Sequence, residues 1–221
     1  MRGIPIDVLK YFAYTSIVAF ILTWIFDIFE ALIKEKSDKY TYWILNMKDL
    51  SMHIMDILQN STRAQATEIT LRVIENPEND TLTLQFIDNG CGMSPEMVSN
   101  VINPFFTTRT TRKVGLGIPL LKQNAELTGG SLQIHSEVGK GTEVTAIFGL
   151  SHIDRPPMGD LAGTVVLTAS AYPTIRFIFH YKNDKIDYIF DTDEVNEALD
   201  GVSIQEPEII QYLREMIEEQ I

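Results

Sequence analysis

In the middle of the chain, apolar residues recur first at helical spacing and then at strand spacing. Leu50, Ile54, Ile57 and Leu58 recur at helical spacing, which predicts an amphipathic helix. Alternation of apolar and polar residues then predicts a strand from Ile69 and another over Thr81–Ile87. The same two patterns predict a helix over 120–127 and strands over 131–137 and 142–148.

After residue 150, a second set of elements is predicted beyond a proline-containing linker, His152–Gly159. Asp191 and Pro207 are typical helix starts, because Asp caps a helix and Pro suits its first turn. We therefore expect a small αβ extension that either continues the first sheet or docks a partner. Its predicted strands cover 164–168, 176–181 and 186–190.

The first 46 residues contain an uncharged, mostly apolar run, Tyr11–Phe26. As a helix this run spans roughly 24 Å, whereas the hydrocarbon core of a bilayer is about 30 Å thick. Extending it over 11–33 adds Asp27 and Glu30, which are tolerable only near the membrane interface. Three interpretations stay open: attachment to the inner face of the membrane, burial against a partner subunit, or sequence upstream of a natural start at Met47.

Composition narrows the function classes. The net charge of the 221 residues is −12, which disfavours a main role on nucleic acid, since phosphate backbones are bound by basic surfaces. The single cysteine, Cys91, excludes an intramolecular disulfide framework and a multi-cysteine zinc site, and it fits the reducing cytoplasm. We expect three parts: a neutral N-terminal helix (1–46), a central domain of charge −3 (47–150) and an acidic extension of charge −9 (151–221).

Two groups of polar residues in the central part suggest chemistry. Asp88 follows a predicted strand, and Gly90 and Gly92 let the backbone turn tightly and approach a ligand. A carboxylate held there can accept a hydrogen bond from an exocyclic amine such as that of adenine. Asp56 and Asn60 share one helix face, where an amide oxygen suits Mg²⁺ and a carboxylate can polarise water or a hydroxyl. Taken singly, each group is equally a polar turn or a solvated helix face.

A third group is the turn Gly115–Leu116–Gly117, which leads into a predicted helix. Free N–H groups at a helix N-terminus bind anions, so this turn is a candidate phosphate site. Arg109, Arg112 and Lys113 concentrate positive charge just before it. On its own, the group is equally a basic loop with ordinary turn glycines.

In combination, these motifs resemble those of the ATP-binding domain shared by sensor histidine kinases, DNA gyrase, heat-shock chaperones and mismatch-repair ATPases. Asp56–Asn60 is similar to the N box of that superfamily, Asp88–Gly92 to the G1 box, Pro104–Thr107 to the F box and Gly115–Gly117 to the G2 box. The resemblance covers roughly residues 50–150. It implies an α+β fold of the Bergerat type, a two-layer sandwich of helices on a mixed, largely antiparallel sheet.

The resemblance also implies roles for individual residues. Asn60 would ligate Mg²⁺ bridging the phosphates, and Asp56 would act as the general base. Asp88 would bind the adenine amino group, with Thr142 supporting the base. Residues 105–112 would form a lid. The remaining implied contacts to ATP are Gly90, Gly92, Met93, Phe106, Lys113, Gly115, Leu116 and Gly117.

The stretch 104–145 looks most like sensor histidine kinases, but two features differ from that branch. No histidine precedes residue 50, and His53 lies within the predicted nucleotide-binding helix, where we expect a structural role. Histidine autophosphorylation in the usual arrangement is therefore not expected. Asp56 resembles instead the acid that mismatch-repair ATPases and anti-sigma serine kinases carry four residues before the N-box asparagine.

The sequence thus predicts an ATP- and Mg-binding signalling protein that hydrolyses ATP slowly or transfers phosphate to a protein partner. The acidic extension is the expected partner surface. Two alternatives stay open, a non-catalytic nucleotide-dependent regulatory module and an anti-sigma-type serine/threonine kinase.

Overall fold

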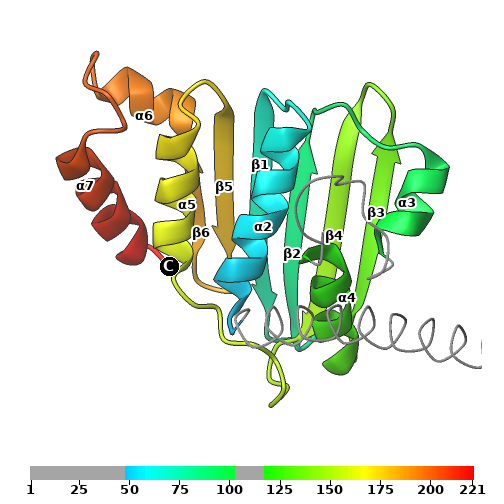
Figure 1. Ribbon diagram of the computed structural model, residues 1–221. Helices are drawn as coiled ribbons and strands as arrows, with labels where there is room; N and C mark the ends of the chain where they lie inside the picture. Colours follow the sequence, from blue (N-terminus) through cyan, green and yellow to red (C-terminus); the bar gives the residue numbers. More distant parts are fainter. Residues whose placement is uncertain (1–47, 103–116) are drawn as a thin grey trace, which may run out of the picture. The chain divides into compact units, whose positions relative to one another are not determined.

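The computed structural model describes residues 48–102 and 117–221, which form a six-stranded sheet with helices against it (Figure 1). The strand order is β3-β4-β2-β1-β5-β6. The strands are β1 (Glu68–Asn76), β2 (Thr81–Asp88), β3 (Ser131–Glu137), β4 (Gly141–Gly149), β5 (Arg176–Lys182) and β6 (Asp187–Asp191). The helices are α2 (Leu50–Arg63), α3 (Pro95–Val101), α4 (Gly117–Leu127), α5 (Leu161–Ala171), α6 (Thr192–Ala198) and α7 (Pro207–Glu218).

Alternation along each strand sets which side chains face the helices. In β2, for example, Leu82, Leu84 and Phe86 are buried and the residues between them are partly exposed. Neighbouring strands pair antiparallel, except that β1 and β5 run parallel. The predicted α+β fold with a mixed, largely antiparallel sheet is therefore confirmed, and the C-terminal extension continues the first sheet through β5.

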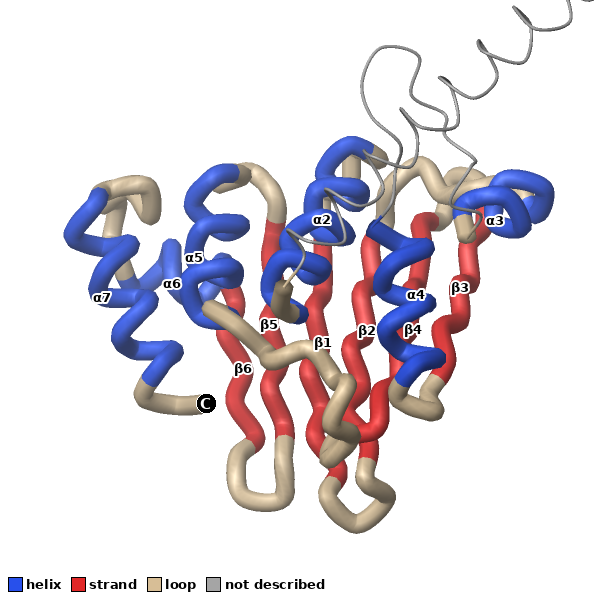
Figure 2. The backbone as a smooth tube through the Cα atoms, turned by 60° about the horizontal axis from the view of Figure 1, so that its bottom comes forward, coloured by secondary structure: helices blue, strands red, loops and turns tan. Residues whose placement is uncertain are grey.

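Helices α2, α4 and α5 lie side by side on one face of the sheet (Figures 1 and 2). The core between these two layers is continuous. In α2 it includes Leu50, Ile54 and Leu58, all without exposed surface. Helix α7 packs on α5 and buries Leu213 and Ile217, so the extension belongs to the same core as the central domain.

Contacts with the linker 152–159 fix the start of α2. The N–H groups of Leu50 and Ser51 each donate to a linker carbonyl at 2.8 Å, and the Asp49 side chain accepts from a first-turn N–H at 3.0 Å. Gly159 has a φ of +75°, and a Cβ there would overlap the side chains of Asp49 and Ser51. The linker therefore satisfies N–H groups that a helix start otherwise leaves unpaired.

One predicted strand, over 164–168, is wrong, because these residues belong to α5. This helix packs against α2, α7 and β5, so most of its circumference is apolar and it shows no helical periodicity. The Asp160 side chain caps it. The hydroxyls of Thr164 and Thr168 donate to carbonyls four residues earlier, each at 2.8 Å, which satisfies them inside a helix.

Among the helices of residues 48–102 and 117–221, none combines the length and apolarity needed to cross a membrane. The apolar run Tyr11–Phe26, on which the membrane interpretation depends, lies outside the described residues.

Candidate functional site

A cavity of about 340 Å³ is lined by residues of α2, α3, β2, β4 and the start of α4. Ile57, Phe86 and Val144 give it an apolar wall, as is typical of small-molecule sites. Six residues predicted from the sequence line it: Asn60, Asp88, Gly92, Met93, Gly117 and Thr142. Four others lie outside the described residues: Phe106, Lys113, Gly115 and Leu116.

Asp88 ends β2 and lies opposite Thr142 of β4 in the antiparallel register. The Ser61 hydroxyl donates to Oδ2 of Asp88 at 2.7 Å, and the Gly90 N–H donates to Oδ1 at 3.0 Å. An ionised carboxylate accepts about four hydrogen bonds, so lone pairs remain for a ligand N–H. Sequence reasoning missed Ser61. The signal was its place on the buried face of α2, since a buried hydroxyl needs a partner.

The two glycines of the Asp88–Gly92 turn are needed because the protein backbone passes close to them. A Cβ on Gly90 would lie 2.7 Å from the carbonyl oxygen of Ala64, at the end of α2. Gly92 has a φ of +64°, and a Cβ there would overlap the backbone of Glu137. The turn is thus held between α2 and the hairpin of β3 and β4, which fixes the position of Asp88.

A small hydrogen-bond network supports the cavity behind Thr142. The Ser136 hydroxyl on β3 lies 2.9 Å from the Thr142 hydroxyl and 2.9 Å from the carbonyl oxygen of Gly141. The Met93 N–H donates to the Ser136 oxygen at 2.8 Å. Ser136 therefore joins both strands of the hairpin to the segment that follows Gly92.

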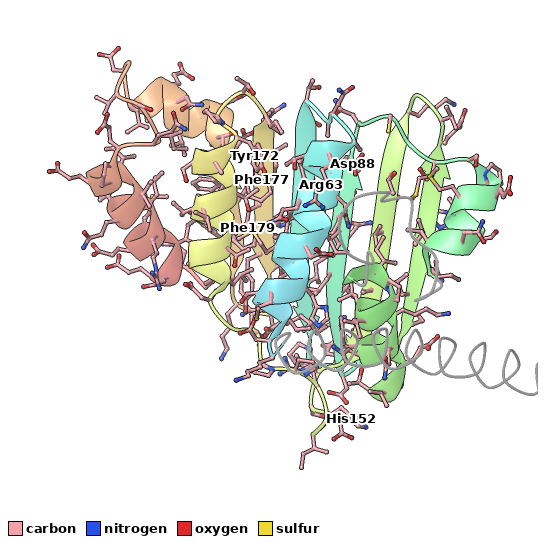
Figure 3. The ribbon with its side chains drawn as sticks, viewed as in Figure 1. Arg63, Asp88, His152, Tyr172, Phe177 and Phe179 are labelled. Atoms are coloured by element: carbon pink, nitrogen blue, oxygen red, sulfur yellow. The ribbon has the colours of Figure 1, made fainter. Side chains whose placement is uncertain are left out.

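The middle of α2 carries Asp56, and Asn60 lies one turn further along the helix. A Cβ on Gly117 would overlap the Asp56 carboxylate, so this carboxylate lies against the first residue of α4. The Arg63 guanidinium donates to Oδ1 of Asn60 at 3.3 Å and also lines the cavity. Figure 3 shows Arg63 and Asp88 near the same end of the sheet. Sequence reasoning gave Arg63 no role, although it lies one turn after Asn60.

The donor set fits a metal ion that is shared with a ligand. Within the described part of the chain, no group of three His, Cys, Asp or Glu side chains could hold a metal. Asn60 contributes a neutral amide oxygen, whereas Mg²⁺ prefers an octahedral shell of oxygen ligands. Phosphate oxygens of a bound nucleotide, with water, would complete such a shell, so Asn60 fits Mg²⁺ held through phosphates.

His53 is fully buried between α2 and α4, where its Nε2 accepts from the Asn124 amide at 2.9 Å. Burial lowers its pKa to about 4, and the smaller opposing effect of Asp49 does not offset this, so the ring is neutral at pH 7. A ring without exposed surface has no access to a nucleotide phosphate in this conformation. The geometry supports the structural role expected from the sequence.

Comparison with known proteins defines the class. Residues 46–152 match the family described as Histidine kinase-, DNA gyrase B-, and HSP90-like ATPase. Together with the α+β fold and the N-box and G1-box residues that line the cavity, this match assigns residues 46–152 to the histidine-kinase-like ATPase superfamily. The resemblance drawn from the sequence is confirmed.

Two named relatives narrow the comparison within that class. Sporulation kinase D of Bacillus subtilis is 32% identical over 111 residues, covering 43% of this chain and 22% of the relative. The sensor protein SrrB of Staphylococcus aureus is 31% identical over 111 residues, covering 47% of this chain and 19% of the relative. The chain thus matches about a fifth of the length of each of these relatives.

A solved structure, the N-terminal domain of a DNA repair protein, aligns with a TM-score of 0.46 at 14% identity, covering 65% of this chain and 51% of that chain. This likeness is too weak to support an inference.

Proposed function

We propose that the chain is an ATP- and Mg-binding signalling protein whose cavity holds the nucleotide with adenine against Asp88. The observation that carries this proposal is how the Asp88 carboxylate is hydrogen-bonded. Ser61 and Gly90 orient its two oxygens from one side, and Thr142 lies opposite it. Its remaining lone pairs suit the exocyclic amino group of adenine, while the apolar wall suits the ring.

The phosphates are expected where α4 begins at Gly117. The N–H groups in the first turn of a helix are unpaired and partly positive, which attracts phosphate oxygens. Arg63 adds a full positive charge to the cavity lining. Asn60 would hold Mg²⁺ jointly with the phosphates, and the bound ion would neutralise charge that develops on them.

Asp56 is the proposed general base, because its carboxylate lies against Gly117, where the phosphates are expected. In hydrolysis it would take a proton from water while the water oxygen bonds to the terminal phosphorus and the bond to the ADP oxygen breaks. The products are ADP and inorganic phosphate. If a partner hydroxyl replaces water, the same proton transfer yields a phosphorylated serine or threonine.

A second candidate function is a regulatory module that binds ATP without turning it over. The observation that favours it is how the acidic extension is joined to the site. Strand β5 pairs with β1, and α5 packs on α2, the helix that carries Asn60. A protein partner bound to the extension, whose charge is −9, would then sense nucleotide through α2.

The test compares wild type with Asp88→Asn, Asp56→Asn and a matched control, Asp184→Asn, whose side chain is in an exposed turn. Calorimetry with ATP should show affinity lost at least tenfold in Asp88→Asn and kept in the other two variants. Undiminished binding in Asp88→Asn would overturn the adenine assignment.

Labelled ATP, with and without cell lysate, separates the two candidate functions. Turnover or phosphorylated protein that disappears in Asp56→Asn supports catalysis with Asp56 as the base. Binding without either product supports the regulatory module, and turnover that survives in Asp56→Asn removes the general-base role.

A further inference from the structure

We propose that Ser136 is a positioning residue that sets nucleotide specificity. By taking up the one hydroxyl hydrogen of Thr142, it makes the Asp88–Thr142 edge of the cavity a pure acceptor of hydrogen bonds, so that the site takes 6-amino purines and discriminates against 6-oxo purines. Ser136 is not among the residues that line the cavity. This inference rests on the proposed nucleotide site.

The partners of Ser136 fix the direction of each hydrogen bond. The Gly141 carbonyl has no hydrogen, so Ser136 must be the donor across the 2.9 Å to its oxygen. The Met93 N–H has no lone pair to offer, so Ser136 must be the acceptor across that 2.8 Å contact. Ser136 thus gives its single hydrogen to Gly141 and retains one accepting position.

The remaining contact of Ser136 is then determined as well. The Thr142 hydroxyl lies 2.9 Å away, and either oxygen could donate if this pair stood by itself. Since the Ser136 hydrogen is already used, Thr142 donates to Ser136. Thr142 consequently has no hydrogen for the cavity it lines and offers lone pairs there.

Asp88, opposite Thr142, has the same polarity. As a carboxylate it only accepts, and it already takes hydrogens from Ser61 and Gly90. Two acceptors side by side complement a 6-amino group, which has two hydrogens. The 6-oxo group of hypoxanthine has none, so its oxygen would face the lone pairs of Thr142 without a partner. A buried polar group left without a partner typically lowers affinity by about tenfold or more.

The test uses calorimetry to measure how tightly the full chain binds ADP and inosine diphosphate (IDP). Both are diphosphates, so neither can donate the terminal phosphoryl group of a triphosphate. The quantity compared is the ratio of the two dissociation constants, IDP over ADP. In Ser136→Ala the Thr142 hydroxyl is free to turn its hydrogen toward a 6-oxo group. The ratio should therefore fall about tenfold, and Ser136→Thr, which keeps a hydroxyl, should restore it to within about twofold of wild type.

A Thr142→Val background shows whether Ser136 acts through Thr142. Without the Thr142 hydroxyl, adding Ser136→Ala should leave the ratio unchanged. A purely structural role for Ser136 would weaken ADP and IDP equally, so an unchanged ratio in Ser136→Ala overturns the inference. A tenfold fall that persists in the Thr142→Val background overturns it too.

The outcomes also separate this inference from the proposed function. If ADP binding depends on Asp88 but the ratio of the IDP and ADP dissociation constants does not change in Ser136→Ala, only the role of Ser136 is overturned. Failure of the wild-type chain to bind either nucleotide overturns both.

Discussion

Ser61→Ala tests how the Asp88 carboxylate, the proposed adenine contact, is held in place. The substitution removes one hydroxyl, which donates to Oδ2 of Asp88 at 2.7 Å, and leaves the contact from the Gly90 N–H to Oδ1. Hydrogen bonds to charged groups contribute about 1.5–3 kcal/mol. Asp88 is only partly buried, so water can replace the lost donor in the free protein and the lower end of that range applies. We therefore expect ADP affinity to fall about tenfold, since about 1.4 kcal/mol corresponds to a factor of ten.

Ser170→Ala is the matched control for this experiment. Ser170 is as buried as Ser61, with 5% against 4% of its surface exposed, but its hydroxyl donates within α5 to the Leu167 carbonyl at 3.3 Å. Both variants should lose similar small amounts of stability in urea unfolding. Only Ser61→Ala should weaken ADP in calorimetry. Equal ADP affinities for the two variants would refute the idea that Ser61 orients Asp88 for the base.

Three further predictions concern stability. Gly159→Ala should destabilise the protein more than Gly139→Ala in urea unfolding. Both positions have left-handed φ, but only Gly159 is crowded by the α2 cap, which adds about 1 kcal/mol to the loss of stability. Equal losses in the two variants would contradict this. The free energy of unfolding of the wild type should fall by about 3 kcal/mol between pH 6.5 and pH 4, because in this range the unfolded chain protonates His53 and the folded chain does not. His53→Asn should remove this fall. A fall that persists in this variant would count against the lowered pKa. The Arg176 guanidinium holds the pKa of Asp191 below its usual range. The stabilisation from this ion pair is therefore present above the pKa of Asp191 in the unfolded chain and is lost as the pH drops through its pKa in the folded chain. Arg176→Gln should therefore unfold at a higher pH in an acid titration, and an unchanged midpoint would refute the link.

The sequence predicted the strands of the central domain because the sheet has helices on one face. One-sided burial leaves an alternating pattern, as in β1 and β2, that can be read without the fold. Helix α5 was mispredicted because burial on most sides removes periodicity, although its eleven uncharged residues exceed the usual strand length. Helix α3 was missed because it has only seven residues, yet the cap Ser94 followed by a proline was a readable start.

Some residues of the site could be predicted from local sequence motifs, whereas others depend on tertiary contacts. Asp88 and Asn60 belong to short motifs, so their place at the cavity was predictable from the sequence. Ser61 and Ser136 acquire their roles only through partners distant in the chain. Ser61 contacts Asp88 across 27 residues, and Ser136 contacts Met93 across 43. The buried position of Ser61 signals that its hydroxyl needs a partner, but the sequence does not say which residue that partner is. Each pairing depends on tertiary contacts: which strand end meets α2 for Ser61, and the register of β3 with β4 for Ser136.

The path of the chain from β4 to β5 explains why the extension is structurally joined to the proposed nucleotide site. Strand β5 pairs parallel with β1 and is separated from β4 by β2 and β1, so the chain must cross part of the sheet before it enters β5. The linker 152–159 binds the first N–H groups of α2 on that crossing, and α5 then packs against the same helix. Asp56, Asn60 and Ser61 are all on α2. A displacement of the extension that moves either contact must therefore be taken up by the helix that carries these residues, which is the physical basis for expecting the extension and the nucleotide to affect each other.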